Sequence, residues 1–137
     1  MTQQQMRITQ EKEKRMKLFK LFTFDSAHFL PKYLGKCKNM HGHTYKLEVG
    51  IEGDIEKTGF IMDFVDVKKA IQTVVIDRYD HKLLNEFFDN PTAEIMAKSM
   101  FKELDEHFIK ENKGKRMGVL RLWETPTSYV EIDNGDI

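Results

Sequence analysis

Alternation of apolar and polar residues predicts two strands in the first part of the chain. Even-numbered positions from Phe22 to His28 share one face, and odd-numbered positions from His41 to Ile51 alternate with mostly polar neighbours. Residues 31–39, between them, contain proline, glycine and several lysines and asparagines, which are typical of a loop. We therefore expect a first strand from about Leu18, a loop, and a second strand from His41.

Apolar residues three and four positions apart then predict two helices. Asp63 is a suitable N-cap for the first, which runs to about Arg78, and residues 60–62 before it suggest a short strand. Thr92 can cap the second helix, which carries an apolar stripe from Ala97 to Phe108. We assign four phenylalanines, Phe22, Phe24, Phe60 and Phe64, and the methionines to the core.

Two further strands, at residues 119–123 and 127–132, complete the pattern, with Thr125 and Pro126 between them. The order is thus two strands, two helices and two strands. Strands that follow one another closely pair antiparallel, so the predicted class is α+β.

Length and composition indicate one soluble intracellular domain. Lys and Arg number 22, as do Asp and Glu, so bulk charge favours neither nucleic acid nor an anionic membrane as a partner. The single cysteine allows no internal disulfide, and no apolar run approaches the length of a membrane span. Residues 1–17 form a polar extension without a signal-peptide pattern, so we expect a catalytic domain at 18–137 and a cytoplasmic location.

Three histidines lie within sixteen positions, in the order His28, His41 and His43. Residues two apart on a strand point the same way, so His41 and His43 can bind one ion together. Three imidazoles suit zinc, copper, iron or nickel, and they leave a coordination position open, as in catalytic zinc sites. On spacing alone, two interpretations stay open: the three histidines bind one metal, or they are unrelated residues of the strands.

Cys37 lies between the first and second histidine, flanked by Lys36 and Lys38. Neighbouring positive charges favour the thiolate, which is the reactive form of cysteine. The alternative is that Cys37 is a fourth ligand that closes a structural zinc site. The spacing alone leaves both interpretations open.

Two further polar positions invite a functional interpretation. Asp80 precedes His81 where the first helix should end, and a carboxylate beside an imidazole can orient it for proton transfer. Glu124 ends a predicted strand, where a carboxylate could accept two hydrogen bonds from an amino-pyrimidine edge. A helix-terminal ion pair and a solvated strand-end glutamate are the simpler alternatives.

With these residues identified, the chain resembles the family of 6-pyruvoyltetrahydropterin synthase and 6-carboxytetrahydropterin synthase. Seven matching stretches occur in the family's order and span about residues 18–132. They are FDSAHFLP (24–31), GKC (35–37), MHGHTY (40–45), GFIMDF (59–64), DHKLLN (80–85), PTAE (91–94) and WETPTSY (123–129).

The resemblance implies roles for the residues singled out above. His28, His41 and His43 would bind one zinc per subunit, and Cys37 would be the proton-abstracting base. Asp80 and His81 would complete the catalytic relay, and Glu124 would anchor the pterin ring and is sometimes counted in that relay. The implied fold is the tunnelling fold, an antiparallel four-stranded sheet with two helices on one face. It implies trimers that pair into a homohexamer, with active sites at subunit interfaces.

The three-residue gap between Cys37 and His41 resembles the bacterial carboxy enzymes of queuosine and deazapurine synthesis. The implied reaction converts 7,8-dihydroneopterin triphosphate to 6-carboxy-5,6,7,8-tetrahydropterin, acetaldehyde and triphosphate. The alternatives are a 6-pyruvoyltetrahydropterin synthase acting on the same substrate, and a non-catalytic zinc-binding assembly protein. Lysines beside Cys37 argue against the related branch that cleaves dihydroneopterin, which carries a glutamate near that position.

Overall fold

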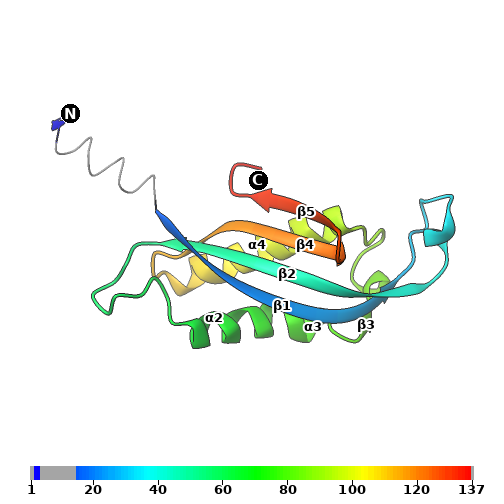
Figure 1. The fold of residues 1–137 in the computed structure, drawn as a ribbon, viewed down its shortest axis with the longest axis horizontal. Coiled ribbons are helices and arrows are strands. Elements are labelled where there is room, and N and C mark those ends of the chain that lie inside the picture. The colour runs from blue at the N-terminus through cyan, green and yellow to red at the C-terminus, as the bar shows by residue number, and fades with distance from the viewer. Residues whose placement is uncertain (1, 4–14, 137) are drawn as a thin grey trace.

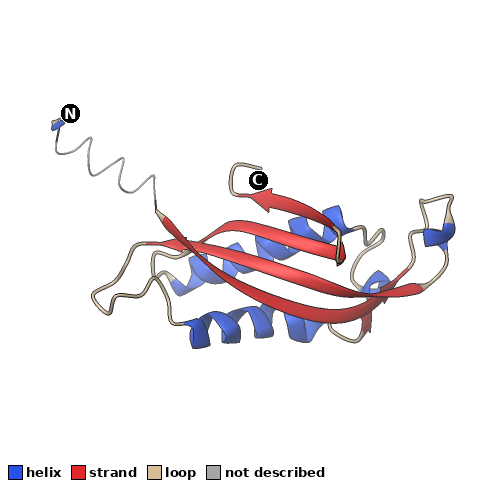
Figure 2. Cartoon of the chain, viewed as in Figure 1, coloured by secondary structure: helices blue, strands red, loops and turns tan. Residues whose placement is uncertain are grey.

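A five-stranded sheet with helices on one face forms the body of the chain in a computed structural model, which describes residues 2, 3 and 15–136 (Figure 1). Figure 2 shows α2, α3 and α4 on the same side of the twisted sheet. The predicted α+β class is confirmed. The bounds of the elements are β1 Met16–His28, η1 Lys36–Lys38, β2 His41–Gly53, α2 Phe64–Ile71, η2 Gln72–Ile76, α3 Asp77–Tyr79, β3 Lys82–Leu83, η3 Leu84–Glu86, α4 Ala93–Glu111, β4 Arg116–Thr125 and β5 Ser128–Asp133.

The two long strands β1 and β2 pair antiparallel along their whole length, from Met16 opposite Gly53 to His28 opposite His41. The predicted alternation is confirmed, because Phe24, Tyr45 and alternate residues beyond them are buried on the helix-covered face. This pairing brings two histidines thirteen positions apart in sequence to opposite places at one end of the sheet.

Both predicted N-caps are confirmed. The Asp63 carboxylate accepts the Val65 N–H at 2.8 Å, and the Thr92 hydroxyl accepts the Ile95 N–H at 3.2 Å. The first helix continues from α2 through the π-helical turn η2 into α3, which ends at Tyr79. The helix therefore ends immediately before Asp80 and His81, as the sequence predicted.

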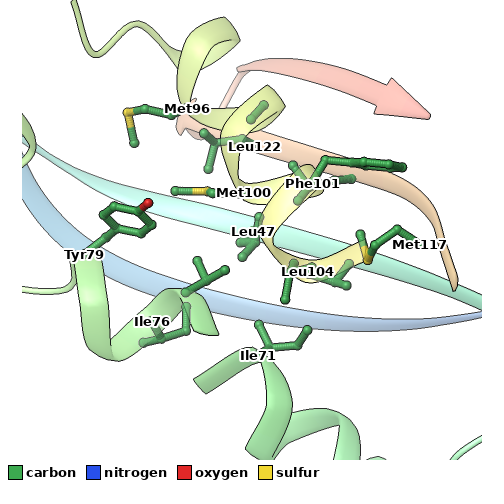
Figure 3. Packing of buried hydrophobic residues seen from close by; sticks show 14 of the residues in the cluster. Leu47, Ile71, Ile76, Tyr79, Met96, Met100, Phe101, Leu104, Met117 and Leu122 are labelled. Atoms are coloured by element: carbon green, nitrogen blue, oxygen red, sulfur yellow. The ribbon is translucent and has the colours of Figure 1, made fainter. Parts of the chain in front are cut away.

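The core lies between the sheet and the helices (Figure 3). Leu47 and Leu122 from the sheet are fully buried together with Ile71, Met100 and Leu104 from the helices. At about 25 cal/mol per Å² of apolar surface removed from water, such side chains contribute most of the stabilisation.

Met16 and Met40, assigned to the core with the other methionines, are exposed, and two of the phenylalanines assigned to the core are not in it either. Phe60 is 53% exposed and Phe64 is 51% exposed. They lie where the chain turns from β2 into α2, and Gly59 has the left-handed φ of 90° that such a turn needs. Apolar character alone did not show that this segment lies at the margin of the core.

The sheet differs from the predicted four-stranded sheet in one strand. β3 is only two residues long and pairs parallel to β1, with Lys82 opposite Ser26 and Leu83 opposite Ala27. A strand this short has no periodic pattern of its own, so the sequence could not reveal it. The short strand predicted at residues 60–62 is absent, because a turn in which Phe60 O accepts the Glu56 N–H occupies that segment.

β1 begins two residues before the predicted domain start at Leu18. Most of the predicted extension, residues 1 and 4–14, lies outside the described residues, and the division at residue 18 stays a prediction. Among the described residues, no helix combines the length and the apolar character required to cross a bilayer.

Candidate metal centre and neighbouring acid–histidine pair

Three histidines and one glutamate meet at the end of the sheet where β1 and β2 finish. One ligand atom from each of His28, His41, His43 and Glu124 lies within 4.8 Å of the others. His28 is fully buried, whereas the other three are half-buried. The site is thus closed toward the core and open toward solvent, as a metal centre that accepts a substrate requires.

Backbone carbonyls orient two of the rings. His28 Nδ1 lies 2.9 Å from Pro91 O, and His41 Nδ1 lies 2.7 Å from Asn39 O, so each Nδ1–H donates to a carbonyl. Neutral rings in this tautomer have a lone pair on Nε2. The two Nε2 atoms nevertheless lie 2.9 Å apart, and the buried Nε2 of His43 has no hydrogen-bond partner. A cation among these nitrogens would remove the lone-pair repulsion and satisfy all three.

Glu124 supplies the negative charge of the cluster. Its Oε1 lies 3.2 Å from Nε2 of both His28 and His43. A hydrogen bond from the protonated form of His28 lowers the pKa of Glu124. Burial lowers the pKa of His43, which keeps the His43 ring in the neutral form that binds metals. Burial opposes protonation of His28, but the Glu124 carboxylate and the Pro91 carbonyl together raise its pKa.

The donor set fits a divalent metal such as zinc. Ligands about 2.0–2.1 Å from a tetrahedral zinc stand roughly 3.4 Å apart, close to the 2.9–3.2 Å separations found among these side chains. Three imidazole nitrogens beside one carboxylate are also donors that suit zinc. The chain therefore contains a cluster able to bind a metal.

The sequence did not reveal how close Glu124 lies to the histidines. The register between β4 and β5 shifts between Trp123 and Thr125, which leaves Glu124 as the extra residue of a bulge. Bulges redirect side chains and are frequent beside active sites. The one available signal was parity, since Glu124 shares a face with the buried Leu122.

Cys37 lies in the 3-10 turn η1, in the loop that joins β1 to β2 (Figure 1). It is half-buried, and its carbonyl accepts the Leu30 N–H at 2.8 Å, which holds the turn near the end of β1. Among the described residues, Cys37 does not belong to the cluster around His28, where the carboxylate is the fourth member. This geometry does not support Cys37 as the ligand that closes a structural site.

Asp80 and His81 form a second polar cluster with Asp25, a residue to which the sequence analysis gave no role. His81 Nδ1 lies 3.0 Å from the Asp80 carboxylate, in agreement with the predicted pair. The Asp25 N–H donates to that carboxylate at 2.9 Å and lowers the pKa of Asp80, so the group stays ionised. An open pocket of about 550 Å³ is lined by Asp25, His43, His81 and Lys82, among others.

The two clusters face different sides of the sheet. Asp25 is paired with Thr44, whereas His43 is paired with Ser26. Successive side chains of a strand point to opposite faces, so Asp25 projects from the face opposite to that of His28 and His43. Within one chain, the acid–histidine pair and the three histidines therefore open in different directions at the same end of the molecule.

Comparison with known proteins identifies the family of the chain. The family model for 6-pyruvoyl tetrahydropterin synthase matches residues 17–135. A 6-carboxy-5,6,7,8-tetrahydropterin synthase of Haemophilus influenzae is 38% identical over 141 residues, covering 84% of this chain and 96% of that protein. A dihydroneopterin monophosphate aldolase of Pyrococcus furiosus is 38% identical over 111 residues, covering 81% and 91%.

A solved structure agrees with the fold. Caenorhabditis elegans 6-pyruvoyl tetrahydropterin synthase superposes with a TM-score of 0.75 at 26% identity, covering 87% of this chain and 95% of that chain. Sequence, fold and the order of the motifs thus lead to the same conclusion. The chain belongs to the 6-pyruvoyl tetrahydropterin synthase family.

Proposed function

We propose that this protein is a zinc-dependent lyase that converts 7,8-dihydroneopterin triphosphate to 6-carboxy-5,6,7,8-tetrahydropterin, acetaldehyde and triphosphate. One water is consumed, and no external oxidant or reductant is required. The relatives named 6-carboxy-5,6,7,8-tetrahydropterin synthase support pterin lyase activity. The observation that carries the proposal is the convergence of three imidazole Nε2 atoms beside a carboxylate.

His28, His41 and His43 would hold the metal through Nε2. Zinc bound there would act as a Lewis acid on hydroxyl groups of the substrate side chain. The carbonyls of Pro91 and Asn39 fix the ligand rings, and the buried position of His28 excludes water from one side. The chain thus prepares the site before any ligand enters.

Glu124 would anchor the pterin. The ring presents an amino group and a neighbouring N–H, both of which are donors, and a carboxylate matches them with two charge-assisted hydrogen bonds. The Glu124 side chain is 31% exposed, so it remains accessible from outside. A pterin held there would extend its side chain across the three histidines.

Cys37, Asp80 and His81 would transfer protons. Cys37 as thiolate would remove a proton from the substrate side chain, and His81, oriented by Asp80, would shuttle it. Because Asp80 and His81 open on the other face of the sheet from the histidine cluster, the proposed relay requires contact between subunits.

A homo-oligomer, which we propose to be a hexamer built from two trimers, would supply that contact. Along residues 16–25 the outer edge of β1 has no strand partner within the described part of the chain, and β5 is the opposite edge. Phe19, Leu21 and Tyr129 are exposed on the helix-free face at 43%, 53% and 54%. Unpaired strand edges and exposed apolar side chains favour association between copies. The cytoplasmic location stays a prediction.

Product analysis tests the reaction. The zinc-loaded protein should release acetaldehyde and triphosphate from dihydroneopterin triphosphate and form the carboxylated pterin. Pyruvoyl product without acetaldehyde would support the pyruvoyl synthase instead.

One relative favours a second candidate function. Because the chain is 38% identical to a dihydroneopterin monophosphate aldolase, dihydroneopterin monophosphate should be offered in parallel. Retro-aldol cleavage of that substrate would give a phosphorylated two-carbon aldehyde. Faster turnover of the monophosphate than of the triphosphate would favour this candidate.

The non-catalytic alternative, an assembly protein with Cys37 as a zinc ligand, predicts a protected thiol. The rate at which Cys37 is alkylated in the zinc-loaded protein distinguishes the enzyme from the assembly protein. Fast alkylation that abolishes turnover supports the enzyme, whereas a thiol protected until zinc is removed supports the structural site.

A further inference from the structure

Asp25 contacts both members of the acid–histidine pair through its main chain. Its N–H donates to the Asp80 carboxylate at 2.9 Å, and its carbonyl accepts the N–H of His81 at 2.6 Å. The pair lies beyond the end of α3, where the Asp80 N–H still donates to the Ile76 carbonyl at 2.8 Å, so β1 and the preceding helix hold it in place together.

The backbone of His81 depends on this support. Its φ of 58° lies in the left-handed region, which costs a residue other than glycine about 1 kcal/mol. The hydrogen bond to the Asp25 carbonyl and the parallel pairing of Lys82 with Ser26 compensate for that cost. Unfavourable backbone conformations kept by their surroundings are frequent at functional sites.

The Asp25 carboxylate also belongs to the cluster. One of its oxygens lies within 4.8 Å of both the Asp80 carboxylate and a ring nitrogen of His81. Thr44, which is paired with Asp25 across β1 and β2, donates its hydroxyl proton to the Asp25 carboxylate. The hydroxyl therefore fixes a second negative charge beside the imidazole, at the wall of the 550 Å³ pocket.

We propose that Asp25, oriented by Thr44, is a positioning residue that sets a second carboxylate near the His81 ring, whose Nδ1 is bound by the Asp80 carboxylate. Asp80 binds Nδ1, so the opposite nitrogen, Nε2, is the one left for proton transfer. The His81 side chain is 77% exposed, so the main-chain contacts of Asp25 and the two nearby carboxylates, and not burial, set the orientation of the ring. For its effect on turnover, this inference rests on the proposed function.

Variants that leave every main-chain contact intact test the proposal. Asp25→Asn keeps the shape and an acceptor for Thr44 but removes the charge, and Thr44→Val removes the donor. Each should lower kcat roughly tenfold with KM, zinc content and Tm unchanged, because misoriented groups lose catalytic efficiency without losing binding. The double variant should be no worse than either single one, and Thr44→Ser should restore kcat. Asp66→Asn, at an exposed position on α2, is the matched control.

NMR of the His81 ring supplies a readout that needs no turnover. Its ring signals should shift and broaden in Asp25→Asn and Thr44→Val, but not in Asp66→Asn. Unchanged signals and unchanged kcat in both variants would overturn the inference while the enzyme assignment stands. A loss of kcat that follows a lower Tm, without rescue by Thr44→Ser, would also overturn it. If His81 responds but wild-type protein leaves the substrate unreacted, the proposed function fails and the positioning role survives.

Discussion

Replacement of Glu124 by glutamine distinguishes a pterin-binding carboxylate from a metal ligand. The side chain lies 3.2 Å from Nε2 of both His28 and His43, so its position alone suits either role. Glutamine has the same shape, but it loses the charge and replaces one acceptor oxygen with an NH₂ donor. We expect Glu124→Gln to retain one zinc per subunit and to lose affinity for the pterin.

The size of the effect follows from the hydrogen bonds involved. A carboxylate that accepts from two adjacent donors makes two charge-assisted bonds, each worth about 1.5–3 kcal/mol. The glutamine oxygen still accepts one hydrogen bond from the pterin, but that bond is weaker because the amide is neutral. At the second position the glutamine NH₂ group faces a pterin N–H, so two donors oppose each other. A loss of about 3–4 kcal/mol corresponds to a fall of roughly 100- to 1000-fold in kcat/KM.

Steady-state kinetics and elemental analysis on the same preparation measure both quantities. Glu106→Gln, at an exposed position on α4, serves as the control and should match wild type in both. Loss of zinc from Glu124→Gln in parallel with activity would refute the anchoring role. If kcat/KM of Glu124→Gln stays within threefold of wild type, Glu124 does not accept two charge-assisted hydrogen bonds from the pterin.

Four further predictions use the same assays. Cys37→Ala should keep its fold and zinc while turnover falls by about 100-fold or more, and near-wild-type turnover would exclude the cysteine as base. His41→Ala should contain much less zinc by elemental analysis, and full occupancy would count against the histidine site. Mixed oligomers of His41→Ala and His81→Ala should regain activity that neither parent has, because the two clusters lie on different faces; no recovery would argue for a site within one subunit. Asp105→Asn should lower the free energy of unfolding by about 1–2 kcal/mol at pH 7, since the Asp105 carboxylate binds the half-exposed Arg116 at 2.8 Å. Arg116 lowers the pKa of Asp105, so this contribution is present above about pH 4 and is lost as the pH falls through the folded-state pKa; a difference that does not shrink as the pH of the urea titrations is lowered would contradict it.

Periodicity predicted most of the fold because each long element carries its own signal. The alternation along β1 and β2 and the caps Asp63 and Thr92 depend on neighbours within a few residues, and the structure confirms them. β3 is too short to show a period, and the exposure of Phe60 and Phe64 depends on where the core ends. Such features belong to the packing of distant segments and have no local pattern.

The candidate site divides in the same way. The sequence by itself determined which residue types are present and that His41 and His43 share a face, because strand geometry alternates side chains. Only the tertiary structure decided that His28 lies opposite His41, that the pairing of β4 with β2 brings the Glu124 carboxylate beside the histidines, and that Asp25 holds Asp80. Contacts between segments far apart in sequence follow from strand register and helix packing, which the whole chain sets together.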